Sequence, residues 1–154
     1  RHLDRVSSLY DKNQLDHLAE RGWLTNVSHE HMPNAVWGDT EQSLEHKARS
    51  YLDINCGHCH NAQGAADTSG LLLDYEDHPP SAIGVCKPPI AAGRGSGGLM
   101  YGVVPGHADK SILSFRLATN DPGMMMPELG RSLIHQEGLA LINDWINGLD
   151  GQCL

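Results

Sequence analysis

The sequence predicts a mainly α-helical domain with long loops and an N-terminal extension. Three observations support this fold class. Apolar residues recur at helical spacing in three segments after residue 38. Glycine and proline interrupt those segments over 61–75 and 79–98 and again at 120–127. The chain of 154 residues has the length of one domain with one core, so residues 1–38 are expected to be an extension that packs on a main body of 39–154.

A short helix is expected in the extension. Asn13 can cap its start, Leu15 and Leu18 give it an apolar side, and Gly22 can stop it. His29 and His31 follow in a loop, where a lone His-x-His pair is more often solvated than bound to a metal.

Three helices are expected in the main body. The first starts near Asp39 or Thr40, where Asp39 and Gln42 resemble a capping box, and it runs directly into Cys56. The second contains Ile112, Leu113, Phe115, Arg116 and Leu117, and 120–123 ends it. The last runs from about Gln136 to Gly148, with an apolar stripe of Leu139, Ile142, Ile146 and Leu149.

The motif Cys56-Gly57-His58-Cys59-His60 has the spacing of a c-type haem attachment site. Two thiols three positions apart can each bond one former vinyl group of the same porphyrin, and the following imidazole can reach the iron. Three other interpretations stay open: a thioredoxin-like redox pair, half of a zinc site, and an ordinary disulfide or two free thiols.

Composition excludes several classes of partner. The formal net charge of −8 leaves no basic patch for nucleic acid, and no apolar run is long enough to span a bilayer. Because the chain starts at Arg1 without a signal peptide, it is interpreted as a mature piece of a longer exported protein. Cys86 and Cys153 are then left over, and two such cysteines in an exported protein most often pair as a disulfide.

A second axial ligand is expected late in the chain, at Met124-Met125-Met126-Pro127. Proline fixes its backbone and can hold the preceding methionine, so Met126 is the first candidate. The alternatives are Met124 or Met125, then Met100 and Met32, and the histidines His78 and His107. Adaptable core packing could also explain the methionines.

The order of helix, C-x-x-C-H, central helix, Met-Pro loop and C-terminal helix resembles a class I cytochrome c over roughly residues 40–149. The stretch 48–61, with Thr68-Ser69-Gly70-Leu71 and 126–131, is similar to monohaem domains appended to larger exported bacterial proteins, some of which bear carbohydrate-binding modules. The resemblance implies a cytochrome c-like helical fold around one covalently attached haem. It also implies thioether bonds at Cys56 and Cys59, with His60 and Met126 as axial ligands.

The expected function is single-electron transfer by haem c with His/Met ligation, not catalysis. The protein would be a periplasmic or extracellular redox partner or relay for a larger exported protein, with a dehydrogenase or an extracellular copper oxidase as possible partners. Candidates to hold the haem propionates are Arg94, Tyr101, Arg116 and Arg131. The alternatives are a haem enzyme or gas sensor with an open distal site, and a binding module whose redox centre is incidental.

Overall fold

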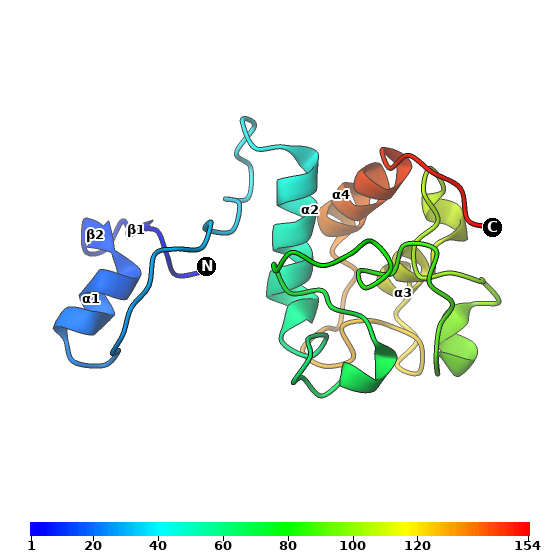
Figure 1. Cartoon of the computed structure of the whole chain (residues 1–154), viewed down its shortest axis with the longest axis horizontal. Helices are drawn as coiled ribbons and strands as arrows, with labels where there is room; N and C mark the ends of the chain where they lie inside the picture. The colour runs from blue at the N-terminus through cyan, green and yellow to red at the C-terminus, as the bar shows by residue number, and fades with distance from the viewer. The chain divides into compact units, whose positions relative to one another are not determined.

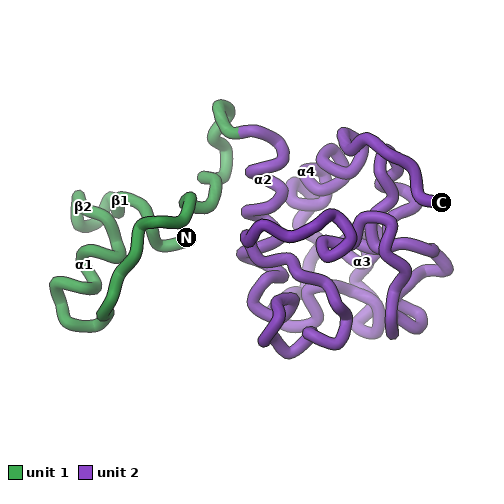
Figure 2. Tube along the Cα trace, in the orientation of Figure 1, with its two compact units in different colours: residues 1–42 green, residues 43–154 purple.

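The computed structural model describes all 154 residues. They form two compact units, Arg1–Gln42 and Ser43–Leu154 (Figure 2), and each unit is described by itself. The expected packing of the N-terminal extension on the main body stays a prediction.

The first unit is a small hairpin followed by a helix. Strands β1 (Val6–Ser7) and β2 (Lys12–Asn13) pair antiparallel, with Val6 opposite Asn13. Helix α1 (Gln14–Glu20) follows directly, and the Asn13 side chain accepts a hydrogen bond from the Leu15 N–H at 2.9 Å. The predicted cap is therefore confirmed, because this side chain satisfies one of the unpaired N–H groups of the first turn.

The second unit contains α2 (Leu44–Leu52), α3 (Ile112–Ala118) and α4 (Gln136–Asn147). Helices α2 and α4 lie side by side (Figure 1). The predicted helices at 112–117 and 136–148 are confirmed, whereas the predicted start of α2 at Asp39 or Thr40 is wrong. The Ser43 hydroxyl accepts from the His46 N–H at 3.1 Å and so caps the helix, while Asp39 accepts from the Glu41 N–H in the preceding turn.

The core of this unit lies where α2 meets α4. Leu52, Ile142 and Ile146 are completely buried there, and Trp145 packs beside them. Burial of each of these aliphatic side chains contributes about 1.5–3 kcal/mol. Leu73, from the loop that follows the cysteine motif, joins the same cluster.

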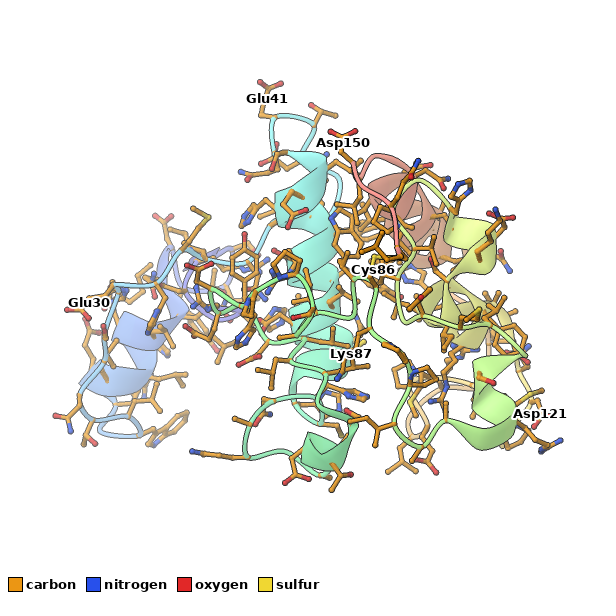
Figure 3. The ribbon with its side chains drawn as sticks, turned by 45° about the vertical axis from the view of Figure 1, so that its right-hand side comes forward. Glu30, Glu41, Cys86, Lys87, Asp121 and Asp150 are labelled. Atoms are coloured by element: carbon orange, nitrogen blue, oxygen red, sulfur yellow. A yellow bond between two sulfur atoms is a disulfide. The ribbon has the colours of Figure 1, made fainter.

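Loops make up most of the remaining chain. They contain 3-10 turns at Asp67–Ser69, Gly93–Ser96 and Ala108–Lys110. Isolated β-bridges pair Val85 with Val103 and Tyr101 with Ser111. A disulfide between Cys86 and Cys153 joins one loop to the last residues of the chain (Figure 3). The predicted disulfide is therefore confirmed. No helix has the length and apolar character needed to cross a bilayer.

The predicted fold class, a mainly α, cytochrome c-like fold, is wrong. Helices hold 32% of the chain, in four α-helices and short turns beside a two-stranded sheet. That share is ordinary for a soluble protein, where roughly 30–35% of residues are helical. The physical reason lies in the interrupting residues, because the prolines and glycines of 61–106 prevent a further α-helix between α2 and α3 and leave only short 3-10 turns there.

Candidate functional site

The cysteine motif sits at the C-terminal end of α2. A π-helical turn, Asp53–Gly57, continues the helix and carries Cys56 into the hydrophobic core, where it is 6% exposed. The N–H groups of Cys59 and His60 both donate to the Cys56 carbonyl, at 3.0 and 2.9 Å. These two hydrogen bonds close a tight turn that contains both thiols and the imidazole. The π-helical turn that precedes it is of a kind frequent at functional sites. Both cysteines are free thiols.

The loop after the motif folds back on it. The Ala66 N–H donates to the Cys59 carbonyl at 3.0 Å, and the Leu73 N–H donates to the His60 carbonyl at 2.8 Å. A Cβ at Gly64 would lie 2.2 Å from the Cys59 carbonyl oxygen, so only glycine permits this approach. The loop therefore holds the backbone of Cys59 and His60 through a hydrogen bond to each of their carbonyl groups.

The His60 imidazole is half-buried and bound on one side. Its Nδ1 lies 3.1 Å from the Ser69 hydroxyl oxygen. Burial, followed by the positive charge of Arg116 and the neighbouring His58, lowers the pKa of His60 below its usual value. The neutral imidazole is thus favoured near neutral pH, which is the form that binds a metal.

The three methionines lie in a loop that is tied to α3. The N–H groups of Met124 and Met125 donate to the Asp121 carbonyl at 2.9 and 2.8 Å, and the Met126 N–H donates to the Arg116 carbonyl at 3.0 Å. The Arg116 guanidinium in turn donates through Nε to the Met124 carbonyl at 2.8 Å. All three methionine residues are half-buried, and the Met126–Pro127 peptide bond is cis.

Two arginines hold this loop and also act electrostatically on groups in or beside the cysteine motif. Arg116 donates to the Met124 carbonyl, and its positive charge is, after burial, a cause of the lowered pKa of His60. Arg131 donates to the Met126 carbonyl, and its positive charge opposes the burial that raises the pKa of Tyr51. The link between the methionine loop and the cysteine motif is therefore electrostatic.

The four propionate candidates separate into two groups. Arg116 and Arg131 hold the methionine loop. A guanidinium nitrogen of the exposed Arg94 lies 3.7 Å from a carboxylate oxygen of Asp121 at the start of that loop. Tyr101 does not join them, since its hydroxyl donates to the Leu154 carbonyl at 2.7 Å. The Arg131 Nε is buried and has no hydrogen-bond partner, so this site retains one unused donor for an anionic group.

The alternative ligands are engaged elsewhere. His78 pairs with Asp74 at 2.7 Å, and His29 in the first unit pairs with Asp4 and Asp16. His107 lies 4.0 Å from Asp109. A four-ligand zinc site made with the other two cysteines is overturned, because Cys86 and Cys153 are bonded to each other. No three His, Cys, Asp or Glu side chains form a group that could hold a metal ion.

A cavity of about 330 Å³ lies away from the motif, beside α2 and α4. None of the residues that line it belongs to the cysteine motif or the methionine loop; they are Glu45, Arg49, Asp77, His78, Pro80, Ile83, Val85, Pro105, Trp145, Leu149 and Asp150. The cavity is therefore not the predicted site.

The residues around the motif fit a c-type haem in their chemistry. Two free thiols at C-x-x-C spacing and an adjacent imidazole favoured in its neutral form are the groups that attach and ligate such a cofactor. Ser69 and Tyr51 belong to this region but were not predicted as site residues, because their contacts depend on how the loop and α4 fold against the motif.

Searches against protein-family models, curated proteins and solved structures found no match to this chain.

Proposed function

We propose that this chain binds one haem c covalently through Cys56 and Cys59 and transfers single electrons. The feature that carries the proposal is the C-x-x-C-H motif, with two free thiols and, next to Cys59, an imidazole that burial favours in its neutral form. The proposal does not depend on the predicted fold class.

Each residue has a separate task. The thiols of Cys56 and Cys59 would form the thioether bonds, and His60 and Met126 would be the iron ligands. Arg131 and Arg116 keep the methionine loop in place, and with Arg94 they offer donors to the propionates. The bound haem supplies one-electron iron chemistry, with a potential that a methionine ligand raises.

The partner is proposed to be a larger redox protein, for example a dehydrogenase or an extracellular copper oxidase. A net charge of −8 favours encounter with a basic surface, so electron exchange should slow as salt is added. The disulfide is typical of the periplasm or the extracellular space, where thiols are oxidised.

The covalent bond is tested by intact mass after denaturation. Protein produced with a haem-attachment system should carry the mass of one haem, and the Cys56→Ser, Cys59→Ser double variant should not. Haem that extracts from the wild-type protein into acidified organic solvent contradicts the proposal.

The distal ligand is tested by single methionine variants. Met126→Ala should remove the weak far-red sulfur-to-iron absorption band and lower the reduction potential, because the soft thioether stabilises Fe(II). Met100→Ala is the matched control, since Met100 is 70% exposed and outside the loop. Loss of the band in Met124→Ala or Met125→Ala would show that Met124 or Met125, and not Met126, is the distal ligand. Rapid CO binding to the native reduced wild-type protein would favour an open distal site and a sensor or enzyme.

A further inference from the structure

The loop that folds back on the cysteine motif ends in a serine with three hydrogen bonds. The Ser69 hydroxyl donates to the Ala66 carbonyl at 2.6 Å. Its oxygen lies 3.2 Å from the Leu71 N–H, which donates to it, and 3.1 Å from Nδ1 of His60. A hydroxyl has one proton and two lone pairs, so these three contacts use its full capacity.

The direction of the His60 contact follows from this count. The single Ser69 proton is given to Ala66, so the Ser69 oxygen can only accept from His60. The opposite arrangement would turn the proton toward His60 and leave two oxygen atoms 2.6 Å apart without a proton between them. Nδ1 of His60 therefore carries the proton, and Nε2 carries the lone pair.

We infer that Ser69 is a positioning residue that fixes the Nδ1–H tautomer of His60 and so presents Nε2 to a metal. The inference rests on the proposed function, in which His60 is the proximal ligand. A histidine that binds a metal usually donates its other ring N–H to a neighbouring acceptor, which sets the ring orientation and makes the ligand more basic.

The backbone keeps Ser69 in this position. The Ser69 N–H also donates to the Ala66 carbonyl, at 3.0 Å, and the Ala66 N–H is held by the Cys59 carbonyl at 3.0 Å. Backbone hydrogen bonds therefore tie the chain between the motif and Ser69 to Cys59, and they keep the Ser69 backbone beside the motif.

The chain contains a matched control at Ser96. The Ser96 hydroxyl donates to the Gly93 carbonyl at 3.0 Å and accepts from the Gly98 N–H at 3.3 Å. Gly93 precedes Ser96 by the same separation as Ala66 precedes Ser69, and Gly98 follows Ser96 as Leu71 follows Ser69. Unlike Ser69, Ser96 has no contact with a histidine. Ser96→Ala therefore removes the two equivalent hydroxyl hydrogen bonds and does not affect a contact of His60.

The experiment compares haem-loaded wild-type protein with Ser69→Ala, Ser69→Thr and Ser96→Ala. The readout is solvent exchange of the His60 Nδ1–H, followed by NMR in the reduced, diamagnetic state, together with the reduction potential. We expect exchange roughly tenfold faster in Ser69→Ala, as for the loss of one hydrogen bond. The potential of this variant should rise, because a less basic imidazole stabilises Fe(III) less. Ser69→Thr keeps the hydroxyl and should restore both values, and Ser96→Ala should match the wild type.

The two proposals fail in different ways. Attached haem with an unchanged Nδ1–H exchange rate and potential in Ser69→Ala overturns the role of Ser69 and leaves the proposed function standing. A wild-type protein without attached haem overturns the proposed function. The tautomer is then measured in the thiol form from the ¹⁵N shifts of His60: a protonated Nδ1 in wild type, lost in Ser69→Ala, supports the role of Ser69, and a protonated Nε2 in wild type overturns it.

Discussion

The two thiols of the cysteine motif have different surroundings. Cys56 is enclosed by the core, and this burial, with the nearby Cys59, raises the pKa of its thiol to about 12. Cys59 is half-exposed. Because the thiolate is the nucleophile, a buried and protonated thiol should react slowly even though it is chemically free.

We therefore predict that iodoacetamide at about pH 8 labels Cys59 at least about ten times faster than Cys56 in the thiol form of the protein. Peptide mass mapping over time measures both rates. Cys59→Ala should leave only the slow reaction. Equal rates at the two positions would show that Cys56 is not enclosed in solution.

A second residue-scale prediction concerns pH in the first unit, where His29 bridges two carboxylates at 2.8 and 3.0 Å. Hydrogen bonds to Asp4 and Asp16 raise the pKa of His29 above its usual 6.5. The stabilisation is therefore complete below about pH 6.5 and is lost as the pH rises through the higher folded value. The hydrogen bond from Asn13, followed by that from His29, lowers the pKa of Asp4 below 3.8, so the contribution of Asp4 is lost only in strong acid.

Hydrogen exchange of the Leu15 amide checks this prediction. Beyond the intrinsic rise of exchange with pH, protection in wild type should decrease as the pH rises above 6.5 and through the raised pKa of His29. His29→Ala should remove the pH dependence, and His31→Ala should retain it. Constant protection from pH 5 to pH 9 in wild type would refute the role of His29.

At the scale of elements, Gly138 of α4 lies directly against Tyr51 of α2. A Cβ there would lie 2.4 Å from the phenol of Tyr51, which stacks on His135 with ring centroids 5.7 Å apart. Gly138→Ala must displace this aromatic ring, at an overpacking cost of about 1–3 kcal/mol. The higher helix propensity of alanine offsets about 1 kcal/mol of this cost, so the free energy of unfolding should fall by up to about 2 kcal/mol.

Gly148→Ala is the control for this prediction, because a Cβ at the end of α4 would meet Asp144 at an ordinary 3.4 Å. Urea unfolding followed by circular dichroism measures both variants. A Gly138→Ala protein as stable as Gly148→Ala would mean that the two helices are not packed this closely.

Local sequence signals predicted α1, α3 and α4 well because each depends on neighbours within a few residues. Asn13 caps α1, apolar spacing marks α3 and α4, and Gly148 follows the last turn of α4. The start of α2 was wrong because two polar residues could each cap a helix, and local spacing does not rank Asp39 against Ser43.

At the scale of the whole molecule, the disulfide connects the last residues of the chain to the loop at Cys86. The two cysteines are 67 positions apart, and closing a loop of this length is worth about 4 kcal/mol in the chain-entropy account. The Cys86→Ser, Cys153→Ser double variant should therefore be about 4 kcal/mol less stable than the oxidised protein.

Urea unfolding of the oxidised protein, the reduced protein and the double variant measures this loss. The reduced wild type should match the double variant, since both lack the same crosslink. A double variant as stable as the oxidised protein would show that the tail is held by packing alone.

The amino-acid sequence by itself determined the features that depend on short separations or on counting. These are the spacing of Cys56, Cys59 and His60, three of the four α-helices, and the pairing of the two remaining cysteines. A motif of five residues needs only one turn of chain to bring its groups together, and a helix needs only its caps and its apolar spacing.

The tertiary structure alone decided the fold class and the neighbours of the motif. It joined Arg116 and Arg131 to the methionine loop, turned Ser69 toward His60 and placed Tyr101 beside Leu154. These contacts depend on the way in which the long loops, which are rich in glycine and proline, pack against two helices. The physical reason is that loop conformation is set by the packing of the whole unit, whereas helical spacing is set within each segment.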